Sequence, residues 1–405
     1  MLFNINIFQI FKKLGGRVMR KIVKQSFLLI SVLLLVALAA CGKSTETSGK
    51  DSAKDGGQAK GLKAKIGVIT YLSGPGAAYG EAITSGFKLA QKEINAKGDV
   101  NIELVIEDSA GKQEQALAAA QKLMSDDDIV ALLGPTLSTE MNVVGPEADL
   151  NGIPIMGTST TAVGIPQIGD YVFRNSIPES LAIPASIKKA VDKYGAKKVA
   201  ILYGNDDVFT KSGYDTMKKE AEKMGLDVLT IETFQKGQSD YNAQLTKIKG
   251  LNPDLILCSA LYNEGAVIMD QARKMGINVP FVGGNGFNSP QVIDIAGKAS
   301  EGLIVATPWF AEKDDPKVKD FVQKFEKEYG KKPDQFAAQA YDALYIYAEA
   351  LKNAGEADRD AFRDALAEIK DLDGVLGKFS FDKEGDVVMD PTVLIIKDGK
   401  FQLFE

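Results

Sequence analysis

Residues 65–94 read KIGVITYLSGPGAAYGEAITSGFKLAQKEI, and this stretch decides the fold class. Its opening apolar run, 66–71, predicts a short buried strand. Four apolar residues then recur at spacings of four, three and four: Ile83, Phe87, Ala90 and Ile94. Such spacing places them on one face of a helix. The stretch therefore predicts a strand followed by an amphipathic helix, which is the repeating unit of parallel sheets.

The same alternation continues along most of the chain. Further strands are predicted at 102–107, 129–133, 153–157, 198–203, 227–232, 254–258 and 279–283. The helices between them are predicted at 112–124, 138–150, 180–194, 210–225, 240–250 and 264–276. Because the strands are nearly continuous apolar runs, they favour parallel sheets that helices cover on both faces.

Two open sheets and one closed barrel could both accommodate these strands, and two features favour open sheets. Segment 160–185 contains three prolines and interrupts the rhythm, as a linker between lobes would. A weak internal repeat, 152–157 against 276–283, suggests two similar lobes. The tail adds helices predicted at 314–329, 334–354 and 358–370 and strands at 377–381, 386–389, 393–397 and 400–404. These tail elements fit a chain that returns to the first lobe and then to the second, so that each lobe is completed by residues near the C-terminus.

The composition excludes several classes of site. The 405 residues carry a formal net charge of −6, which gives no general electrostatic basis for binding nucleic acid. The chain has no histidine, which excludes histidine-dependent catalytic triads and histidine-ligated metals. Two cysteines are too few for a disulfide scaffold or an iron–sulfur cluster. At this length we expect two lobes, each with its own core.

The N-terminal region predicts export. Basic residues follow Met19, the apolar run 27–38 comes next, and two alanines precede Cys41, an order that resembles the lipobox of bacterial lipoproteins. The run is short for a spanning helix, which needs about 20 residues, although a retained membrane anchor is the alternative. We interpret 19–40 as a signal peptide and Cys41 as the acylated residue.

Two further segments flank this signal. Residues 1–18 carry a separate apolar patch, and we interpret them as an upstream extension ahead of a true start at Met19. Segment 41–61 is rich in glycine, serine and lysine and cannot pack a core. It is expected to be a flexible tether.

Loops that follow predicted strands are the first place to look for a ligand site. Three of them, in the first half, carry hydroxyl or glycine residues at helix starts: 72–80, 134–139 and 157–161. Hydroxyls and free N–H groups at helix N-termini suit a carboxylate without any cation. Each serine or threonine alone also fits a simple N-cap, but the three loops together favour a ligand site.

Loops of the second half carry aromatic, amide and acidic residues: 204–209, 259–264, 283–286 and 307–309. A cleft between the two sets suits a small amphiphilic ligand with a carboxylate at one end. Trp309, the only tryptophan, falls at a predicted crossing between lobes, and core packing explains it equally well.

Catalytic motifs are poorly supported. No phosphate loop or Gly-x-Gly-x-x-Gly sequence follows a strand. Segments 85–88 and 186–189 match Ser-x-x-Lys, but the companion Ser-Asp-Asn element is missing, so we interpret both as solvated helix faces. Cys258 ends an apolar strand and is interpreted as a small buried hydrophobic residue. The sequence therefore predicts a binding protein that is not an enzyme and needs no cofactor or metal.

Several short motifs occur in a characteristic order: the lipobox, Ser73-Gly-Pro, Tyr79-Gly80, Gly134-Pro-Thr with Ser138, the Thr158–Thr161 run, Gln271-Ala-Arg, Gly283-Gly-Asn-Gly286 and Ala340-Tyr-Asp-Ala-Leu344. In this order they resemble the branched-chain amino acid binding proteins of ABC importers. The resemblance implies the type I periplasmic binding protein fold, an α/β architecture of two doubly wound parallel-sheet lobes joined by a three-crossing hinge. The lobes would comprise 62–176 plus 309–385 and 177–308 plus 386–405.

The resemblance also implies roles for individual residues. Ser138 and Thr161 would receive the α-carboxylate of the ligand through hydroxyls and backbone amides. Ser159 and Thr160 would offer carbonyl and hydroxyl groups to its ammonium.

Three aromatic residues would line the side-chain pocket: Tyr79, Phe209 and Phe336. Two positions depart from the family. Asn285 stands where an acidic residue commonly pairs with the ammonium, and Leu261 stands where an aromatic residue is common. Glu264 could compensate for the missing acid if its side chain turned into the cleft.

The resemblance implies an extracytoplasmic, monomeric protein that is anchored to the membrane by lipid on Cys41. It would bind a small apolar amino acid such as leucine, isoleucine or valine and deliver it to an ABC permease pair with its ATPases. A ligand-sensing receptor module and a binder of a non-amino small carboxylate or amide are the alternatives.

Overall fold

The computed structural model describes residues 61–405. The predicted upstream extension, signal peptide, acylated Cys41 and nearly all of the tether lie outside the described residues. Within 61–405 no helix combines the length and the apolar character that a membrane crossing requires.

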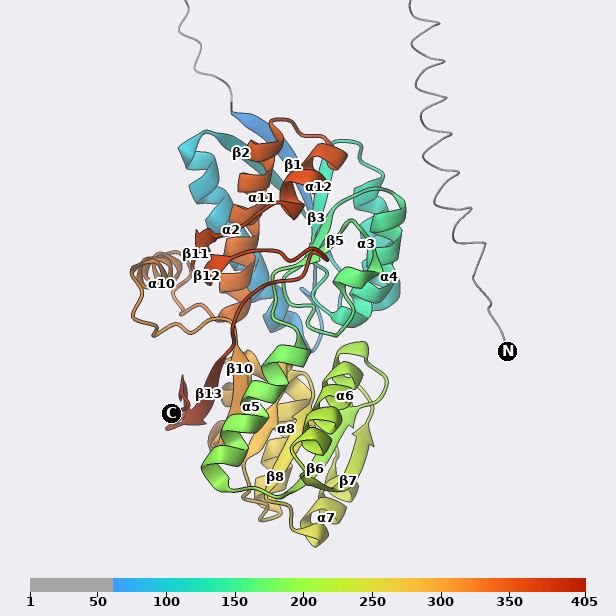
Figure 1. Cartoon of the computed structure of the whole chain (residues 1–405), viewed down its shortest axis with the longest axis vertical. Helices are drawn as coiled ribbons and strands as arrows, with labels where there is room; N and C mark the ends of the chain where they lie inside the picture. The colour runs from blue at the N-terminus through green and yellow to red at the C-terminus, as the bar shows by residue number, and fades with distance from the viewer. Residues whose placement is uncertain (1–60) are drawn as a thin grey trace, which may run out of the picture. The chain divides into compact units, whose positions relative to one another are not determined.

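Five parallel strands form the first sheet (Figure 1). In spatial order they are β2 (Val100–Asp108), β1 (Leu62–Thr70), β3 (Ile129–Leu133), β4 (Ile155–Gly157) and β5 (Val172–Arg174). The predicted first strand and its neighbours are confirmed. β1 lies inside the sheet between β2 and β3, and its apolar residues are buried on both faces, with Val68 in one core cluster and Ile69 in another.

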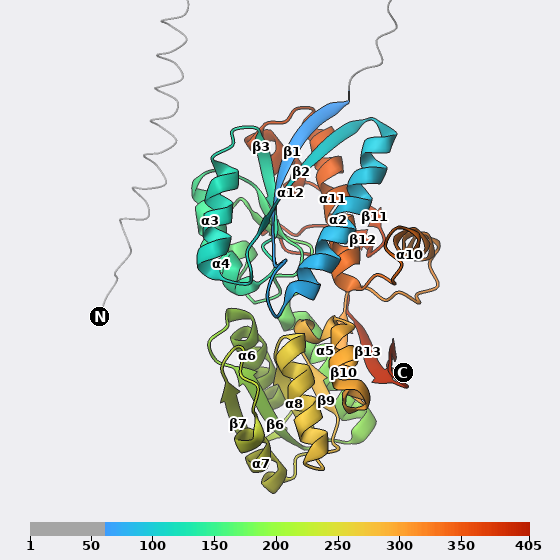
Figure 2. The ribbon, with the colours of Figure 1, turned by 180° about the vertical axis from the view of Figure 1, so that it is seen from behind.

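Helices cover both faces of this sheet. One face carries α2 (Ala77–Lys97), α11 (Gln335–Ala354) and α12 (Arg359–Ala367), and the other carries α3 (Gln113–Met124) and α4 (Ser138–Leu150) (Figure 2). α2 and α11 pack closely because Gly86 has no side chain, and a Cβ there would lie 2.1 Å from the Ala337 carbonyl oxygen. Residues far apart in sequence thus complete one lobe, as predicted for the helices near the end of the chain.

The second sheet has seven strands. In spatial order they are β14 (Lys400–Leu403), β13 (Thr392–Lys397), β10 (Leu303–Thr307), β9 (Phe281–Gly283), β8 (Leu255–Ser259), β6 (Lys198–Gly204) and β7 (Asp227–Phe234). Pairing is parallel from β10 to β7, whereas β13 pairs antiparallel with both β10 and β14. The second sheet therefore has the predicted parallel strands from β10 to β7, and the late strands β13 and β14 add an antiparallel edge.

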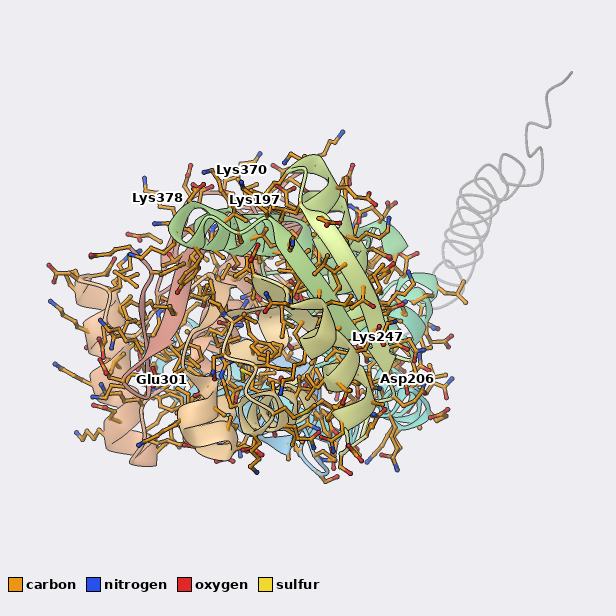
Figure 3. All side chains as sticks on the ribbon, turned by 90° about the horizontal axis from the view of Figure 1, so that it is seen from below. Lys197, Asp206, Lys247, Glu301, Lys370 and Lys378 are labelled. Atoms are coloured by element: carbon orange, nitrogen blue, oxygen red, sulfur yellow. The ribbon has the colours of Figure 1, made fainter. Side chains whose placement is uncertain are left out.

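Helices also cover both faces of the second sheet. Its two faces carry α5 (Glu179–Tyr194) with α6 (Val208–Lys223), and α7 (Asn242–Leu251) with α8 (Tyr262–Lys274) and α9 (Gln291–Ala296). Short 3₁₀ turns occur at η1 (Pro166–Ile168), η2 (Asn285–Asn288) and η3 (Gly297–Ser300). Charged side chains such as Lys197 and Lys247 extend from the surface of this lobe (Figure 3).

The chain passes between the two sheets three times. It leaves the first sheet after β5, returns after β10 to form α10 (Pro316–Tyr329), α11 and α12 with the hairpin β11 (Leu372–Gly374) and β12 (Gly377–Phe379), and then enters the second sheet again at β13. The predicted architecture of two doubly wound open sheets is confirmed, and the closed barrel is excluded.

Two local predictions differ from the structure. Segment 160–185 was expected to be a linker, and the first crossing between the sheets lies in it after β5, but the segment also contains the edge strand β5, which was not predicted. Residues 386–389 were expected to form a strand, yet only an isolated bridge joins Val387 to Phe381. Asp386 instead turns back to meet Arg174.

Candidate functional site

A cavity lies where the carboxyl ends of the two sheets face each other. From the first lobe it is lined by Tyr79, Thr136, Leu137, Ser138, Ser159 and Phe336. From the second lobe it is lined by Phe209, Leu261, Asn285 and Gly286. The space open to the centre of a water molecule is only about 20 Å³, so the two lobes are closed against each other.

The structure brings seven of the ten predicted residues together at this cavity: Tyr79, Ser138, Ser159, Phe209, Leu261, Asn285 and Phe336. Thr160, Thr161 and Glu264 do not line it. Three lining residues were not singled out from the sequence: Thr136, Leu137 and Gly286. All three fall inside loops that were, because the ends of parallel strands converge on one edge.

Tyr79 ties the two lobes together across the cavity. Its hydroxyl donates to the Gly286 carbonyl oxygen at 2.5 Å and accepts from the Tyr262 backbone N–H at 2.9 Å. Its ring packs edge-on against Tyr262 and Phe336, with centroids 4.7 and 4.8 Å away. Burial raises the pKa of the Tyr79 hydroxyl well above its usual value, so this group remains a hydrogen-bond donor at neutral pH.

The hydroxyl of Ser138 lies at the first turn of α4. It accepts a hydrogen bond from the Ala162 N–H at 3.2 Å, which leaves its own proton to donate. The preceding Leu137 N–H donates to Glu140 Oε2 at 2.9 Å and closes the helix start. The N–H groups of this first turn and the Ser138 hydroxyl together form a donor-rich surface suited to an anion.

The remaining hydroxyls of the first lobe have different roles. Ser159 Oγ donates to the Thr136 carbonyl oxygen at 2.6 Å. Thr160 is buried, and its hydroxyl has no hydrogen-bond partner among the described residues. The Thr161 hydroxyl donates to Glu179 Oε1 at 3.3 Å, at the start of α5. Because the Thr161 hydroxyl proton is used in this bond, the hydroxyl cannot donate it to a ligand carboxylate at the same time.

Asn285 holds its place through three neighbours. Its backbone N–H donates to Glu179 Oε1 at 2.9 Å. Its side-chain oxygen accepts from Gln335 Nε2 at 2.5 Å and lies 3.5 Å from Asn288 Nδ2. Because both neighbours are donors, a carboxylate oxygen would fit the same position.

Glu264 lies beside the cavity and does not enter it. It lines an adjoining space together with Leu261, Asp207 and Lys236. Its Oε1 accepts from the Gly237 N–H at 3.0 Å. The side chain is therefore directed to the loop after β7. Trp309 is also absent from the cavity wall, because its ring is buried against Phe321.

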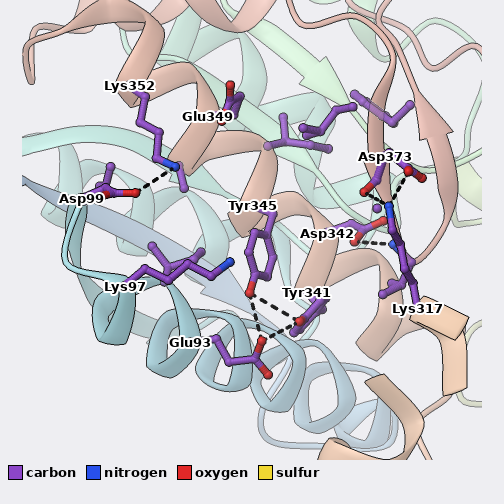
Figure 4. A pocket seen from close by; sticks show the side chains of 18 of the residues that line it. Glu93, Lys97, Asp99, Lys317, Tyr341, Asp342, Tyr345, Glu349, Lys352 and Asp373 are labelled. Atoms are coloured by element: carbon purple, nitrogen blue, oxygen red, sulfur yellow. Dashed lines mark hydrogen bonds and ion pairs between the residues drawn. The ribbon is translucent and has the colours of Figure 1, made fainter. Parts of the chain in front are cut away.

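A larger cavity, about 330 Å³, lies elsewhere on the first lobe between α2, α10, α11 and the β11–β12 hairpin (Figure 4). Its polar groups bind one another. Tyr341 and Tyr345 donate to Glu93 Oε2 at 2.9 and 3.0 Å, and Lys352 pairs with Asp99. We place the candidate site at the smaller cavity because its groups converge from both lobes. No cluster of acidic, cysteine or histidine residues within 61–405 is arranged to hold a metal ion.

Comparison with known proteins agrees with this architecture. The family described as periplasmic binding protein matches residues 63–400. A leucine-, isoleucine-, valine-, threonine- and alanine-binding protein of Pseudomonas aeruginosa is 28% identical over 327 residues, which cover 80% of this chain and 87% of that protein.

Solved structures extend the likeness. The branched-chain amino acid transporter substrate binding protein LivJ from Streptococcus pneumoniae, solved in complex with isoleucine, is 31% identical and has a TM-score of 0.79, with 84% of this chain and 98% of that chain covered. The leucine binding protein LivK from Thermotoga maritima is 26% identical and has a TM-score of 0.80, with 84% and 97% covered. This chain belongs to the periplasmic binding protein family, and its two lobes have the type I fold of these structures.

Proposed function

We propose that this protein is the extracytoplasmic solute-binding component of an ABC importer, and that it binds leucine, isoleucine or valine in the cavity between its lobes. The observation that carries the proposal is the pairing of donors and apolar groups around that cavity. Ser138 and the start of α4 lie on one side, and the rings of Tyr79, Phe209 and Phe336 form the wall. Relatives that bind branched-chain amino acids support it.

In this proposal the α-carboxylate binds the Ser138 hydroxyl and the N–H groups of the first turn of α4. Ser159, which lines the cavity, offers its hydroxyl oxygen to the ammonium. Thr160 and Thr161 were expected to take part, but they do not line the closed cavity, and the Thr161 hydroxyl donates to Glu179. An amino acid cannot enter a space of about 20 Å³, so we expect the lobes to separate for entry and to close again on the ligand.

We also propose that lipid on Cys41 anchors the protein outside the cell membrane, and that an ABC permease pair with its ATPases receives the ligand. The tether 41–61 would then hold a monomeric body within reach of the permease, since a coil of this length spans about 25 Å.

A matched pair of ligands tests the proposal. Leucine should raise the unfolding temperature and give a calorimetric binding signal, because a ligand at about 100 times its Kd adds about 2.7 kcal/mol of stability. The deaminated analogue 4-methylpentanoate, which has the same carbon skeleton, should bind much more weakly. Preference for 4-methylpentanoate would contradict the amino acid assignment.

A non-amino carboxylate is the second candidate ligand, because none of the described residues that line the cavity is acidic. Asn285→Asp separates the two classes. The variant should preserve or strengthen leucine binding, since the aspartate keeps both donors from Gln335 and Asn288 and adds a charge for the ammonium. Calorimetry on the best ligand gives the sign. Weaker binding by the variant would indicate a ligand without an amine, because two carboxylates would then repel each other.

A further inference from the structure

An ammonium group in a closed cavity requires a nearby negative charge, because an isolated buried charge is destabilising by several kcal/mol. The described residues of the cavity wall are neutral. If the proposed amino acid ligand is correct, on which this inference rests, any protein charge that adds to the ligand's own carboxylate in stabilising the ammonium comes from behind the wall.

Four buried carboxyl groups lie beside or behind it: Glu140, Glu179, Asp207 and Glu264. Glu140 binds the Leu137 N–H, Asp207 binds the Thr139 hydroxyl, and Glu264 binds the Gly237 N–H. The Lys236 ammonium attracts the carboxylate of Glu140 and lines the same adjoining space as Asp207 and Glu264. These three acids therefore have a lysine of the protein itself nearby.

Glu179 has a different set of neighbours. Its Oε1 accepts from the Asn285 N–H at 2.9 Å and from the Thr161 hydroxyl at 3.3 Å. Its backbone N–H donates to the Thr161 carbonyl oxygen at 2.8 Å. Thr161 comes from the first lobe and Asn285 from the second, so one fully buried carboxylate joins the two lobes, and of these two residues Asn285 lines the cavity. The Glu179 Oε2 atom is buried without a hydrogen-bond partner among the described residues, as is one carboxylate oxygen of Glu140 and one of Glu264.

A glycine allows the Glu179 carboxylate to lie close to the chain that forms the wall. Gly284 precedes Asn285, and a Cβ there would lie 3.0 Å from Glu179 Oε1. Arg174, at the end of β5, is the charged group that attracts Glu179, but its guanidinium forms a two-bond pair with Asp386. Glu179 is thus the buried acid that bonds directly to Asn285 in the cavity wall, and its cationic neighbour is already paired with Asp386.

We propose that Glu179 is the positioning residue that supplies the negative charge for the ligand ammonium, acting through Asn285 and Thr161 from behind the cavity wall. The carboxylate stabilises the ammonium through its electric field in the closed cleft and orients Asn285 in the wall and Thr161 behind it. A ligand lacking an amine gains nothing from this charge.

The proposal has a pH signature. Burial raises the pKa of Glu179 to about 7, against the lowering effects of the Asn285 N–H, the Thr161 hydroxyl and Arg174. A bound ammonium favours the carboxylate, so leucine binding should lower this pKa and release a proton near neutral pH. Leucine affinity should then be highest above the pKa and should fall by about tenfold or more between about pH 8 and about pH 5.5.

The experiment is calorimetry with leucine on the parent protein and Glu179→Gln across that range, with proton release measured on the parent in buffers of different ionisation enthalpy. Glu179→Gln should bind about tenfold more weakly than the parent at about pH 8 and show no pH dependence. Asp342→Asn is the matched control, because burial also raises the pKa of Asp342, to about 6, while its carboxylate binds the Val375 and Leu376 N–H groups away from the cavity, and this variant should retain the parental pH dependence. Asn285→Asp in the Glu179→Gln background should restore affinity.

The outcomes separate the two proposals. Leucine that fails to bind the parent at any pH overturns the proposed function. Leucine that binds the parent and Glu179→Gln with the same affinity and pH profile overturns the role of Glu179. If Glu179→Gln does not fold, the parent still decides, because binding without proton release near neutral pH contradicts the proposal.

Discussion

Replacing Arg174 with leucine is expected to lower the free energy of unfolding by about 3–5 kcal/mol, the usual effect of removing one member of a buried ion pair. The Arg174 side chain is 2% exposed. Its Nε and Nη2 donate to the two carboxylate oxygens of Asp386 at 2.7 and 2.6 Å. Its Nη1 donates to the carbonyl oxygens of Thr160 and Ala162 at 3.2 and 2.7 Å. Leucine would leave all four oxygen atoms without these donors.

Urea unfolding followed by circular dichroism measures this loss as a lower midpoint. Lys188→Ala is the control, since it removes an exposed pair with Asp192 on α5 that is worth about 0.5 kcal/mol or less. Arg174→Leu combined with Asp386→Leu should recover part of the stability, because the unpaired carboxylate is then removed as well. An unchanged urea midpoint in Arg174→Leu would show that the Arg174–Asp386 pair does not stabilise the third crossing of the chain between the lobes.

Ser138→Ala is expected to weaken leucine binding by about 1.5–3 kcal/mol, the range for a hydrogen bond to a charged group. Ser138 lies in the cavity wall and is 1% exposed. Water therefore has little access to the position of the removed hydroxyl in the closed state and would not replace it as a hydrogen-bond donor. The affinity should fall because the ligand carboxylate would lose one donor while remaining desolvated.

Isothermal calorimetry at about pH 8 measures this change. Ser85→Ala provides a matched control, because the Ser85 hydroxyl donates to the Glu81 carbonyl oxygen of its own helix. The Ser85→Ala variant should bind leucine with the affinity of the parent protein. Equal affinities for the parent and Ser138→Ala would place the carboxylate elsewhere in the cleft.

Much of the site could be predicted from the sequence because it depends on local patterns. The alternation of apolar strands and helices identifies where each strand ends, and the ends of parallel strands lie at one edge. This reasoning located Ser138 after β3 and Asn285 after β9. β5 was missed because its third residue is Arg174, and a charged residue indicates an exposed position, although this side chain is buried in the fold.

The sequence by itself determined the fold class, the order of its elements and the loops that form the cavity, because burial on a strand or helix leaves a regular spacing of apolar residues. Only the tertiary structure decided where the polar side chains point. Thr161 meets Glu179, Glu264 turns toward Gly237, and Arg174 pairs with Asp386, 212 positions away. Such contacts join elements that are distant in sequence and depend on side-chain direction, and neither property produces a local pattern.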